Sequence, residues 1–241
     1  MPASHGGIVK LCSPSDRIKP RETALQKKSK TNVAAPEPLR ARQAERRGAR
    51  AKSENRLEEV LSSAANLFYA KGFHGTTIED VARDVGMLKG SLYYYIKSKD
   101  DLLFRLLLSV IEQGDLFIAK EIGPKSEPVA QLQVAIEAQI DYIIQNQVRI
   151  GLFLHEFDAL PEKRQKRVLA VMTRYNNRFV ELVQRGQREG KFAEGDPWLI
   201  VNGLLGMCNW IYRWYHAQHP TDPAAVKQVF VRMIMKGIVK D

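Results

Sequence analysis

Cysteine is scarce in this chain of 241 residues, which contains only Cys12 and Cys208, far apart and without a CxxC pair. This scarcity excludes a disulfide framework and a zinc site built on cysteines. It is typical of a protein that works in a reducing cytoplasm.

Long hydrophobic runs are also absent. The most apolar stretch, Trp198 to Tyr215, is interrupted by Asn202, Asn209 and Arg213, so it predicts a buried helix and not a membrane span. The N-terminus has no continuous apolar core of the kind that secretory signals contain. No alternating strand pattern, internal repeat or glycine-rich phosphate loop occurs, and the expected fold class is therefore all-α.

The stretch from Thr77 to Leu103 predicts two short helices joined by a tight turn and followed by a third helix. Thr77 is the expected N-cap, with Asp80 three residues later to complete a capping box. Gly86 supplies the positive-φ residue that ends the first helix. Each short helix has an apolar stripe, formed by Ile78, Val81, Ala82 and Val85 in the first and by Leu88, Leu92, Tyr95 and Ile96 in the second. This is the pattern of a helix-turn-helix, whose second helix enters the DNA major groove.

The expected outer face of the second helix has an unusual composition, with Lys89, Gly90, Ser91, Tyr93 and Tyr94. Gly90 lowers helix stability but allows a partner to approach the backbone closely. Ser91 can bond to a base edge or a phosphate, and the tyrosine hydroxyls can reach phosphate oxygens. The alternative is that the tyrosines pack under the next helix, as Tyr95 is expected to do in part.

The pattern TT-I-x-D-V-A-x-x-x-G, followed by KGSLYYYIKSKDDLL, resembles the DNA-binding domain of TetR-type transcriptional regulators over about Arg56 to Leu107. One departure is Leu88, which stands where that family usually has Ser or Thr at the start of the recognition helix, so a capping hydroxyl is missing. The DNA-binding residues expected from the pattern and the resemblance are Thr77, Lys89, Gly90, Ser91, Tyr93, Tyr94, Tyr95, Lys97 and Lys99.

Positive charge is concentrated at the N-terminus. Of the formal net charge of +10, residues 1–55 carry +8, with 13 Lys/Arg and 5 Asp/Glu, whereas Arg56 to Arg105 holds seven basic and seven acidic residues. DNA binding by the helix-turn-helix must therefore depend on positioned donors and not on bulk charge. Residues 1–52 have few large apolar residues, scattered prolines and many arginines, which predicts a disordered tail. The alternative is a basic arm that follows the phosphates or enters the minor groove.

The remaining sequence predicts helices throughout, about nine in total, which matches what the resemblance implies. We expect a helix-turn-helix domain over residues 53–98 and a helical regulatory and dimerisation domain over residues 99–241. The expected helices outside the two short ones are Ser53–Lys71, a helix capped by Ser98 that runs to about Lys120, Pro128 to about Asn146, Val148–Phe157, Pro161 to about Arg188, Pro197–Ala217 and Pro223–Val239.

The helix expected from Pro197 to Ala217 is apolar on nearly every side, so both of its faces must be covered. The resemblance implies a ligand cavity on one side and a second subunit on the other, with the last two helices forming a four-helix bundle in a homodimer. A two-fold dimer matches a palindromic operator whose half-sites lie about 34–36 Å apart.

Within this helix, GMCNWIYRWY is similar to TetR-type repressors of fatty-acid or steroid-ring degradation that respond to acyl-CoA thioesters. An aromatic wall beside an arginine suits an elongated apolar ligand with an anionic end. The alternative is that these tryptophans pack in the core or the dimer interface. The expected ligand-binding residues are Phe153, Met172, Tyr175, Phe179, Trp210, Arg213 and Trp214.

His155, Glu156 and Asp158 invite a metal or acid–base interpretation, but their spacing on a helix end does not bring them to one face, so a surface or pocket-rim role is expected. The sequence therefore predicts a cytoplasmic, nucleoid-associated repressor without catalytic residues, cofactor or metal, released from its operator by a small molecule. An alternative is an architectural or partner-recruiting DNA binder without a ligand. A helical enzyme would need convergent titratable groups, and the sequence shows none.

Overall fold

The computed structural model describes residues 37–123, 127–215 and 221–240, with residues 37–46 and 49 described by their backbone only. Across these residues the chain is helical, and its only β feature is one antiparallel bridge between Phe192 and Val239. The predicted all-α class is confirmed. No described helix is both long and apolar enough to cross a bilayer.

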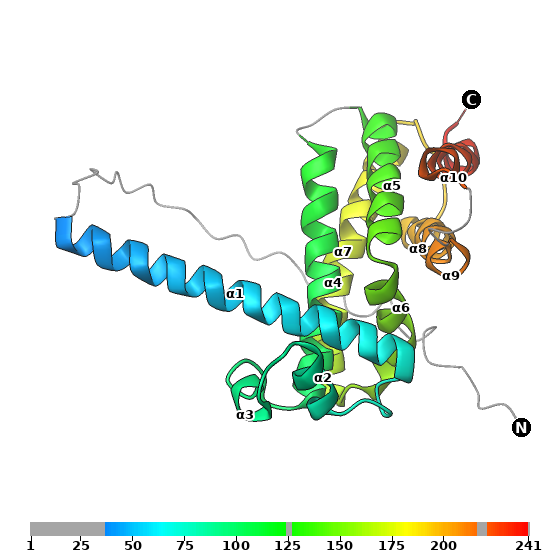
Figure 1. Ribbon diagram of the computed structural model, residues 1–241. Coiled ribbons are helices and arrows are strands. Elements are labelled where there is room, and N and C mark those ends of the chain that lie inside the picture. Colours follow the sequence, from blue (N-terminus) through cyan, green and yellow to red (C-terminus); the bar gives the residue numbers. More distant parts are fainter. Residues whose placement is uncertain (1–36, 124–126, 216–220, 241) are drawn as a thin grey trace, which may run out of the picture.

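The head of the molecule consists of α1 (Glu37–Lys71), α2 (Ile78–Asp84) and α3 (Lys89–Leu92). The C-terminal half of α1 packs against α2, and its N-terminal half projects beyond the rest of the described chain (Figure 1). Gly72, at φ 75°, follows the last residue of α1, and the predicted end of this helix at Lys71 is confirmed.

The predicted start of α1 at Ser53 is wrong, because α1 begins at Glu37. The expectation of a disordered tail is consequently wrong for residues 37–52, while residues 1–36 lie outside the described residues. This segment is rich in Ala, Arg, Lys and Glu, all good helix formers, and it continues a helix whose nucleus is already held by packing.

Among the described residues, the body contains seven further helices and the 3-10 turn η2 (Phe157–Ala159). Helices α4, α5 and α7 pack against one another, α8 and α10 cover α5 on one side, and α6 joins α1 to α4 (Figure 1). The side chains of Ser98, Asp196 and Asp222 accept hydrogen bonds from the first turns of α4, α8 and α10, and the cap predicted at Ser98 is thereby confirmed. The body helices are α4 (Lys99–Ile122), α5 (Pro128–Gln145), α6 (Gln147–Glu156), α7 (Glu162–Arg188), α8 (Pro197–Asn209), α9 (Ile211–Trp214) and α10 (Pro223–Ile238).

The helix predicted to run from Pro197 to Ala217 is instead two helices, and Ala217 lies outside the described residues. The chain tightens at Trp210, where the Arg213 amide donates to the Trp210 carbonyl at 3.0 Å in place of a four-residue bond. The inner face of α8 nevertheless continues into α9, because Ile211 and Tyr212 are buried three and four residues after the buried Cys208.

One hydrophobic core extends from the head into the body. Helix α4 connects the two parts, because Leu102, Leu103, Leu106 and Leu107 are almost completely buried along its first half. The head is thereby fixed to a helix whose middle lies inside the body.

Candidate DNA interface and ligand cavity

The turn between α2 and α3 has the geometry that the sequence predicts. Thr77 caps α2 by accepting a hydrogen bond from the Asp80 amide at 3.1 Å, and the Asp80 carboxylate accepts from the Thr77 amide at 3.0 Å. Gly86 has φ 64°, and the Met87 amide closes the turn on the Ala82 carbonyl at 2.8 Å. These bonds set α3 at a defined angle to α2.

The inner side of α3 and the residues that follow it is formed by Leu92 and Ile96, which are buried, and by the half-buried Tyr95. The prediction that Leu88 faces inward is wrong, because its side chain is 80 % exposed. Leu88 is the N-cap of α3, with an extended backbone (φ −70°, ψ 143°), so it precedes the helical stripe that turns inward.

The outer side of α3 is open. Tyr94 is 84 % exposed, Tyr93 is also exposed, and a side chain built at Gly90 would meet no atom within 4 Å. Ser91 lies on the same exposed surface. A partner could therefore reach the backbone of α3 without displacing any described part of the chain.

The three lysines expected at this surface have different surroundings. Lys89 pairs with Glu79 of α2, which raises the pKa of Lys89 and lowers that of Glu79. Lys97 is exposed. Lys99 donates to the carbonyls of Phe73 and Thr76 at 3.0 and 3.1 Å, so it is a structural clamp as well as a candidate phosphate contact.

An acidic residue that the sequence did not single out joins the head to α7. Asp101 is buried and accepts hydrogen bonds from the Lys97 amide at 3.2 Å, from Arg105 at 2.9 Å and from Arg164 at 3.3 Å. Burial acts to raise the pKa of Asp101, but the amide and the two guanidinium groups outweigh it and the pKa is lowered. The sequence showed Asp101 only as a first-turn acid of α4.

Helix α6 makes a second junction with the head. Arg149 bonds to Ser62 at 2.8 Å and pairs with Glu58 on α1, and the Glu156 carboxylate accepts from the Phe73 amide at 3.2 Å. His155 instead contacts the Tyr212 hydroxyl at 2.8 Å. His155 and Glu156 thus face different partners, and no group of three metal-ligating side chains occurs in the described part of the chain.

The body encloses a cavity of about 240 Å³ between α4, α5, α6, α7 and α8. Most of its wall is apolar, and none of the described residues that line it is charged. Its polar groups are amides and phenols, including a chain in which Tyr175 donates to Gln139 and Gln139 donates to Asn209 at 3.1 Å. Burial raises the pKa of Tyr175, so it remains a neutral donor. The lining residues are Val110, Ile111, Gly114, Gln139, Tyr142, Ile150, Phe153, Leu154, Met172, Tyr175, Asn176, Asn202, Leu205, Gly206 and Asn209.

The structure brings only part of the predicted ligand set to this cavity. Phe153, Met172 and Tyr175 line it, and Phe179 is fully buried behind the Tyr175 ring, with centroids 5.8 Å apart. The amides of Gln139, Asn202 and Asn209 were missed as lining residues, although the two asparagines lie seven residues apart and hence on one face of α8.

The predicted wall of Trp210, Arg213 and Trp214 does not line the cavity. All three side chains are exposed, because they lie on the side of the chain opposite the buried Cys208, Ile211 and Tyr212. Trp214 stacks on Phe230 of α10 with centroids 6.0 Å apart. Arg213 is therefore an exposed charge and does not face the cavity.

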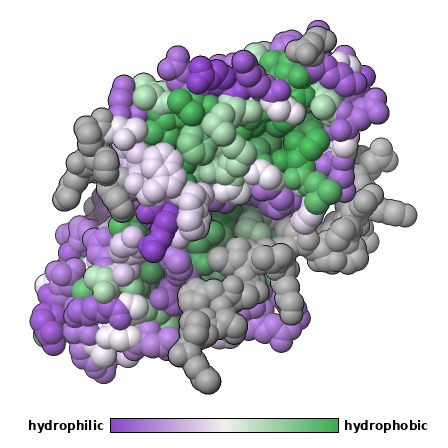
Figure 2. Space-filling view, turned by 90° about the vertical axis from the view of Figure 1, so that its right-hand side faces the viewer, coloured by the Kyte–Doolittle hydropathy of each residue, from purple (hydrophilic) through white to green (hydrophobic). Residues whose placement is uncertain are grey.

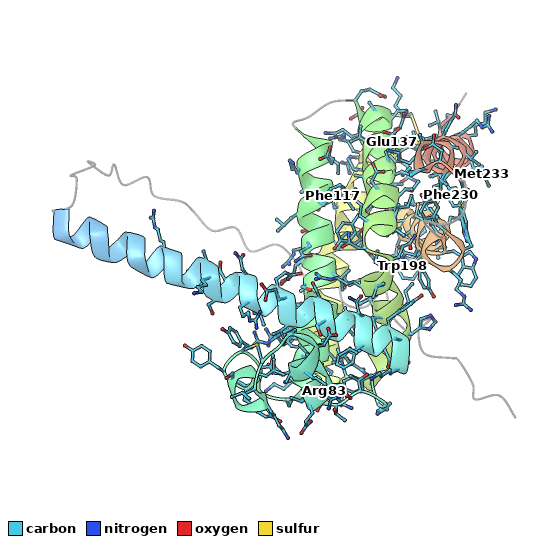
Figure 3. The ribbon with its side chains drawn as sticks, viewed as in Figure 1. Arg83, Phe117, Glu137, Trp198, Phe230 and Met233 are labelled. Atoms are coloured by element: carbon cyan, nitrogen blue, oxygen red, sulfur yellow. The ribbon has the colours of Figure 1, made fainter. Side chains whose placement is uncertain are left out.

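The outer side of α8, α9 and α10 is apolar and uncovered. Leu199, Trp210 and Met233 are 62 %, 61 % and 55 % exposed, and Met207 and Val229 are also exposed. Figure 2 faces this side and shows hydrophobic surface gathered on it, and Figure 3 labels Phe230 and Met233 on α10. A hydrophobic area of this kind marks an interaction surface.

Two family models match the chain. Residues 60–106 match bacterial regulatory proteins, tetR family, and residues 125–238 match the tetracyclin repressor-like C-terminal domain. The chain is 23 % identical over 189 residues to the HTH-type transcriptional repressor KstR2 of Mycobacterium tuberculosis. The aligned region covers 78 % of this chain and 94 % of KstR2. It is 31 % identical over 165 residues to the probable HTH-type transcriptional regulator ArpR of Pseudomonas putida. The aligned region covers 61 % of this chain and 77 % of ArpR.

The fold is also found in the crystal structure of AibR in complex with isovaleryl coenzyme A and operator DNA. That structure has a TM-score of 0.68 and 23 % sequence identity, covering 74 % of this chain and 97 % of AibR. The matches to the head and to the body together settle the class of protein. The chain belongs to the tetR family of bacterial regulatory proteins, and it is a helix-turn-helix transcriptional regulator and not an enzyme.

Proposed function

We propose that this regulator is a homodimeric repressor that binds a palindromic operator in the cytoplasm and releases it when an acyl-CoA thioester enters the body. The observation that carries the proposal is the position of α4. Its first turns lie in the core of the head through Leu102 and Leu103, and its middle lines the cavity through Val110, Ile111 and Gly114. A ligand in the cavity thus contacts the same helix that holds the DNA-binding head.

The cavity fits the acyl part of such a ligand. At roughly 30 Å³ for each water-sized group, its volume holds about eight groups, which is a short or branched acyl chain. Its uncharged wall suits an apolar chain with a carbonyl that an amide or phenol can bond. The nucleotide and its phosphates would remain outside, where their charges stay hydrated. That AibR was crystallised with isovaleryl coenzyme A on the same fold supports this ligand class.

The apolar surface of α8 to α10 supports the dimer. Leu199, Gly203, Met207 and Trp210 follow one another at spacings of four, four and three residues along α8 and its end, so they form one stripe. Pairing this stripe with its copy would bury apolar area that is now in water. The two recognition helices would then face the same side of the DNA.

The alternative of an architectural DNA binder without a ligand predicts a filled body. The cavity argues against it, and a direct test uses two neighbouring asparagines of α7. Asn176 lines the cavity, whereas Asn177 is exposed and does not. Asn176→Phe should fill the cavity, keep operator affinity and abolish release by acyl-CoA compounds.

The matched control is Asn177→Phe, which should be released like the wild type. Operator affinity is measured by fluorescence anisotropy, with and without a panel of acyl-CoA thioesters of increasing chain length, beside a melting curve for each protein. Equal release of both variants would refute the cavity as the ligand site. Absence of release by any thioester from the wild type would refute the ligand class.

A further inference from the structure

Leu88 is a large apolar side chain that stands in water at the start of the recognition helix. It is 80 % exposed, and its N-cap position has no side-chain hydrogen bond to the helix. Burial of a leucine side chain is favourable, and the described chain does not bury this one. Its exposure therefore favours a role in contact with a partner and not a role in folding.

The surroundings of Leu88 leave it prominent. The next side chain, Lys89, turns aside to pair with Glu79 on α2. Gly90 has no side chain, and no atom lies within 4 Å of the place where one would start. The start of α3 therefore presents an apolar projection beside a gap, and the charge next to it is neutralised. In a helix-turn-helix the N-terminal residues of the second helix contact base edges.

We propose that Leu88 reads the C5-methyl group of a thymine at one position in each operator half-site. In the major groove the base edges carry hydrogen-bond donors and acceptors, and the apolar group among them is the thymine methyl. A leucine cannot bond to the others, and it would desolvate the N4 donor of a cytosine without replacing its water. The proposal rests on the proposed function in one respect, since it requires that α3 enters the groove.

The test uses deoxyuridine, which lacks only the methyl group and keeps every hydrogen bond of thymine. An operator is first selected from random DNA with the full chain, and each thymine is then replaced by deoxyuridine in turn. For the wild type we expect one position per half-site at which binding weakens about fourfold, and about fifteenfold when both half-sites are changed.

Leu88→Ala should lose this discrimination and bind the thymine and deoxyuridine operators equally. The control is Leu116→Ala, because Leu116 is similarly exposed, at 70 %, but lies on α4 in the body. It should keep the wild-type profile. Leu88→Ser, which restores a capping hydroxyl, should also lose the discrimination while keeping the wild-type melting temperature, so that a folding defect is not mistaken for a missing contact with the base.

Two results would overturn the proposal. One is a deoxyuridine penalty that persists unchanged in Leu88→Ala, which would assign the methyl contact to another residue. The other is a wild-type protein that selects an operator but shows no deoxyuridine penalty at any position. If the wild type selects no DNA sequence at all, the proposed operator binding itself fails, and this outcome is distinct from both.

Discussion

Replacing Lys99 by alanine is expected to weaken the fold of the head. Its ammonium nitrogen lies 3.0 Å from the Phe73 carbonyl, 3.1 Å from the Thr76 carbonyl and 4.5 Å from the centre of the Phe73 ring. These contacts tie the start of α4 to the segment between α1 and α2. The side chain therefore helps to hold the helix-turn-helix against the helix that leads into the body.

The size of the effect follows from these contacts. A hydrogen bond to a charged donor contributes about 1.5–3 kcal/mol, and a cation over an aromatic ring about 0.5–1 kcal/mol. Lys99 is partly exposed, so water can replace it at both carbonyls, and the Thr76 amide still donates to the Phe73 carbonyl at 3.3 Å. We therefore expect a net loss of about 1.5 kcal/mol, which lowers the melting temperature of a chain of this size by about 3–6 °C.

The assay is a thermal melt of four proteins, combined with the salt dependence of operator binding. Lys97→Ala is the control, because Lys97 is exposed two residues away. It should melt like the wild type and reduce the salt slope by about 0.9 for each phosphate that is no longer neutralised. Lys99→Met keeps the apolar stem over the Phe73 ring and should lose less stability than Lys99→Ala. A Lys99→Ala protein that melts with the wild type would refute the clamp.

Two further outcomes are expected. Gly203→Ala should weaken the dimer in sedimentation experiments, because a methyl group at the centre of the α8 stripe separates the two subunits, although it stabilises α8 itself by about 1 kcal/mol. The control is Gly48→Ala, at an exposed position of α1, which should leave the dimer unchanged. A Gly203→Ala dimer as tight as the wild type would place the interface elsewhere. Deleting residues 1–50 should leave a folded dimer, because the buried side chains that the structure describes on α1 begin at Val60. It should reduce operator affinity more at low salt than at high salt. Loss of sequence preference would show that this segment reads bases.

Local patterns predicted most of the helices, because caps and apolar spacing are properties of a few neighbouring residues. Ser98 caps the helix assigned to it, and Gly86 has the positive φ expected of it. The failures also have local causes. A stripe at helical spacing does not show where the helix begins, so Leu88 was placed inside α3 when it is the cap outside it.

The cavity could not be predicted in the same way, because five helices contribute to its wall. The aromatic cluster of Trp210 and Trp214 was assigned to the ligand on the assumption of a continuous helix to Ala217. The buried face of α8 continues through Cys208, Ile211 and Tyr212, so the two tryptophans fall on the opposite, outer face. In a helix that is apolar on nearly every side, spacing alone does not show which face meets the cavity. Phe153, Met172 and Tyr175, which the sequence assigned to ligand binding, line the cavity, but the amides that give the cavity its polarity were not assigned.

Two helices join the cavity to the head, and their contacts suit them to different tasks. The start of α4 is held by close-packed leucines, and moving it would disturb the core of the head. Helix α6 lines the cavity with Phe153 and Leu154, and two residues later Glu156 accepts the hydrogen bond from the Phe73 amide. This contact is polar and partly exposed, so it can break and reform with water at little cost. We therefore expect that a ligand displacing Phe153 shifts α6 first and that α4 follows as a rigid unit. A coupling of about 1–3 kcal/mol between the sites would suffice to change operator occupancy several-fold or more.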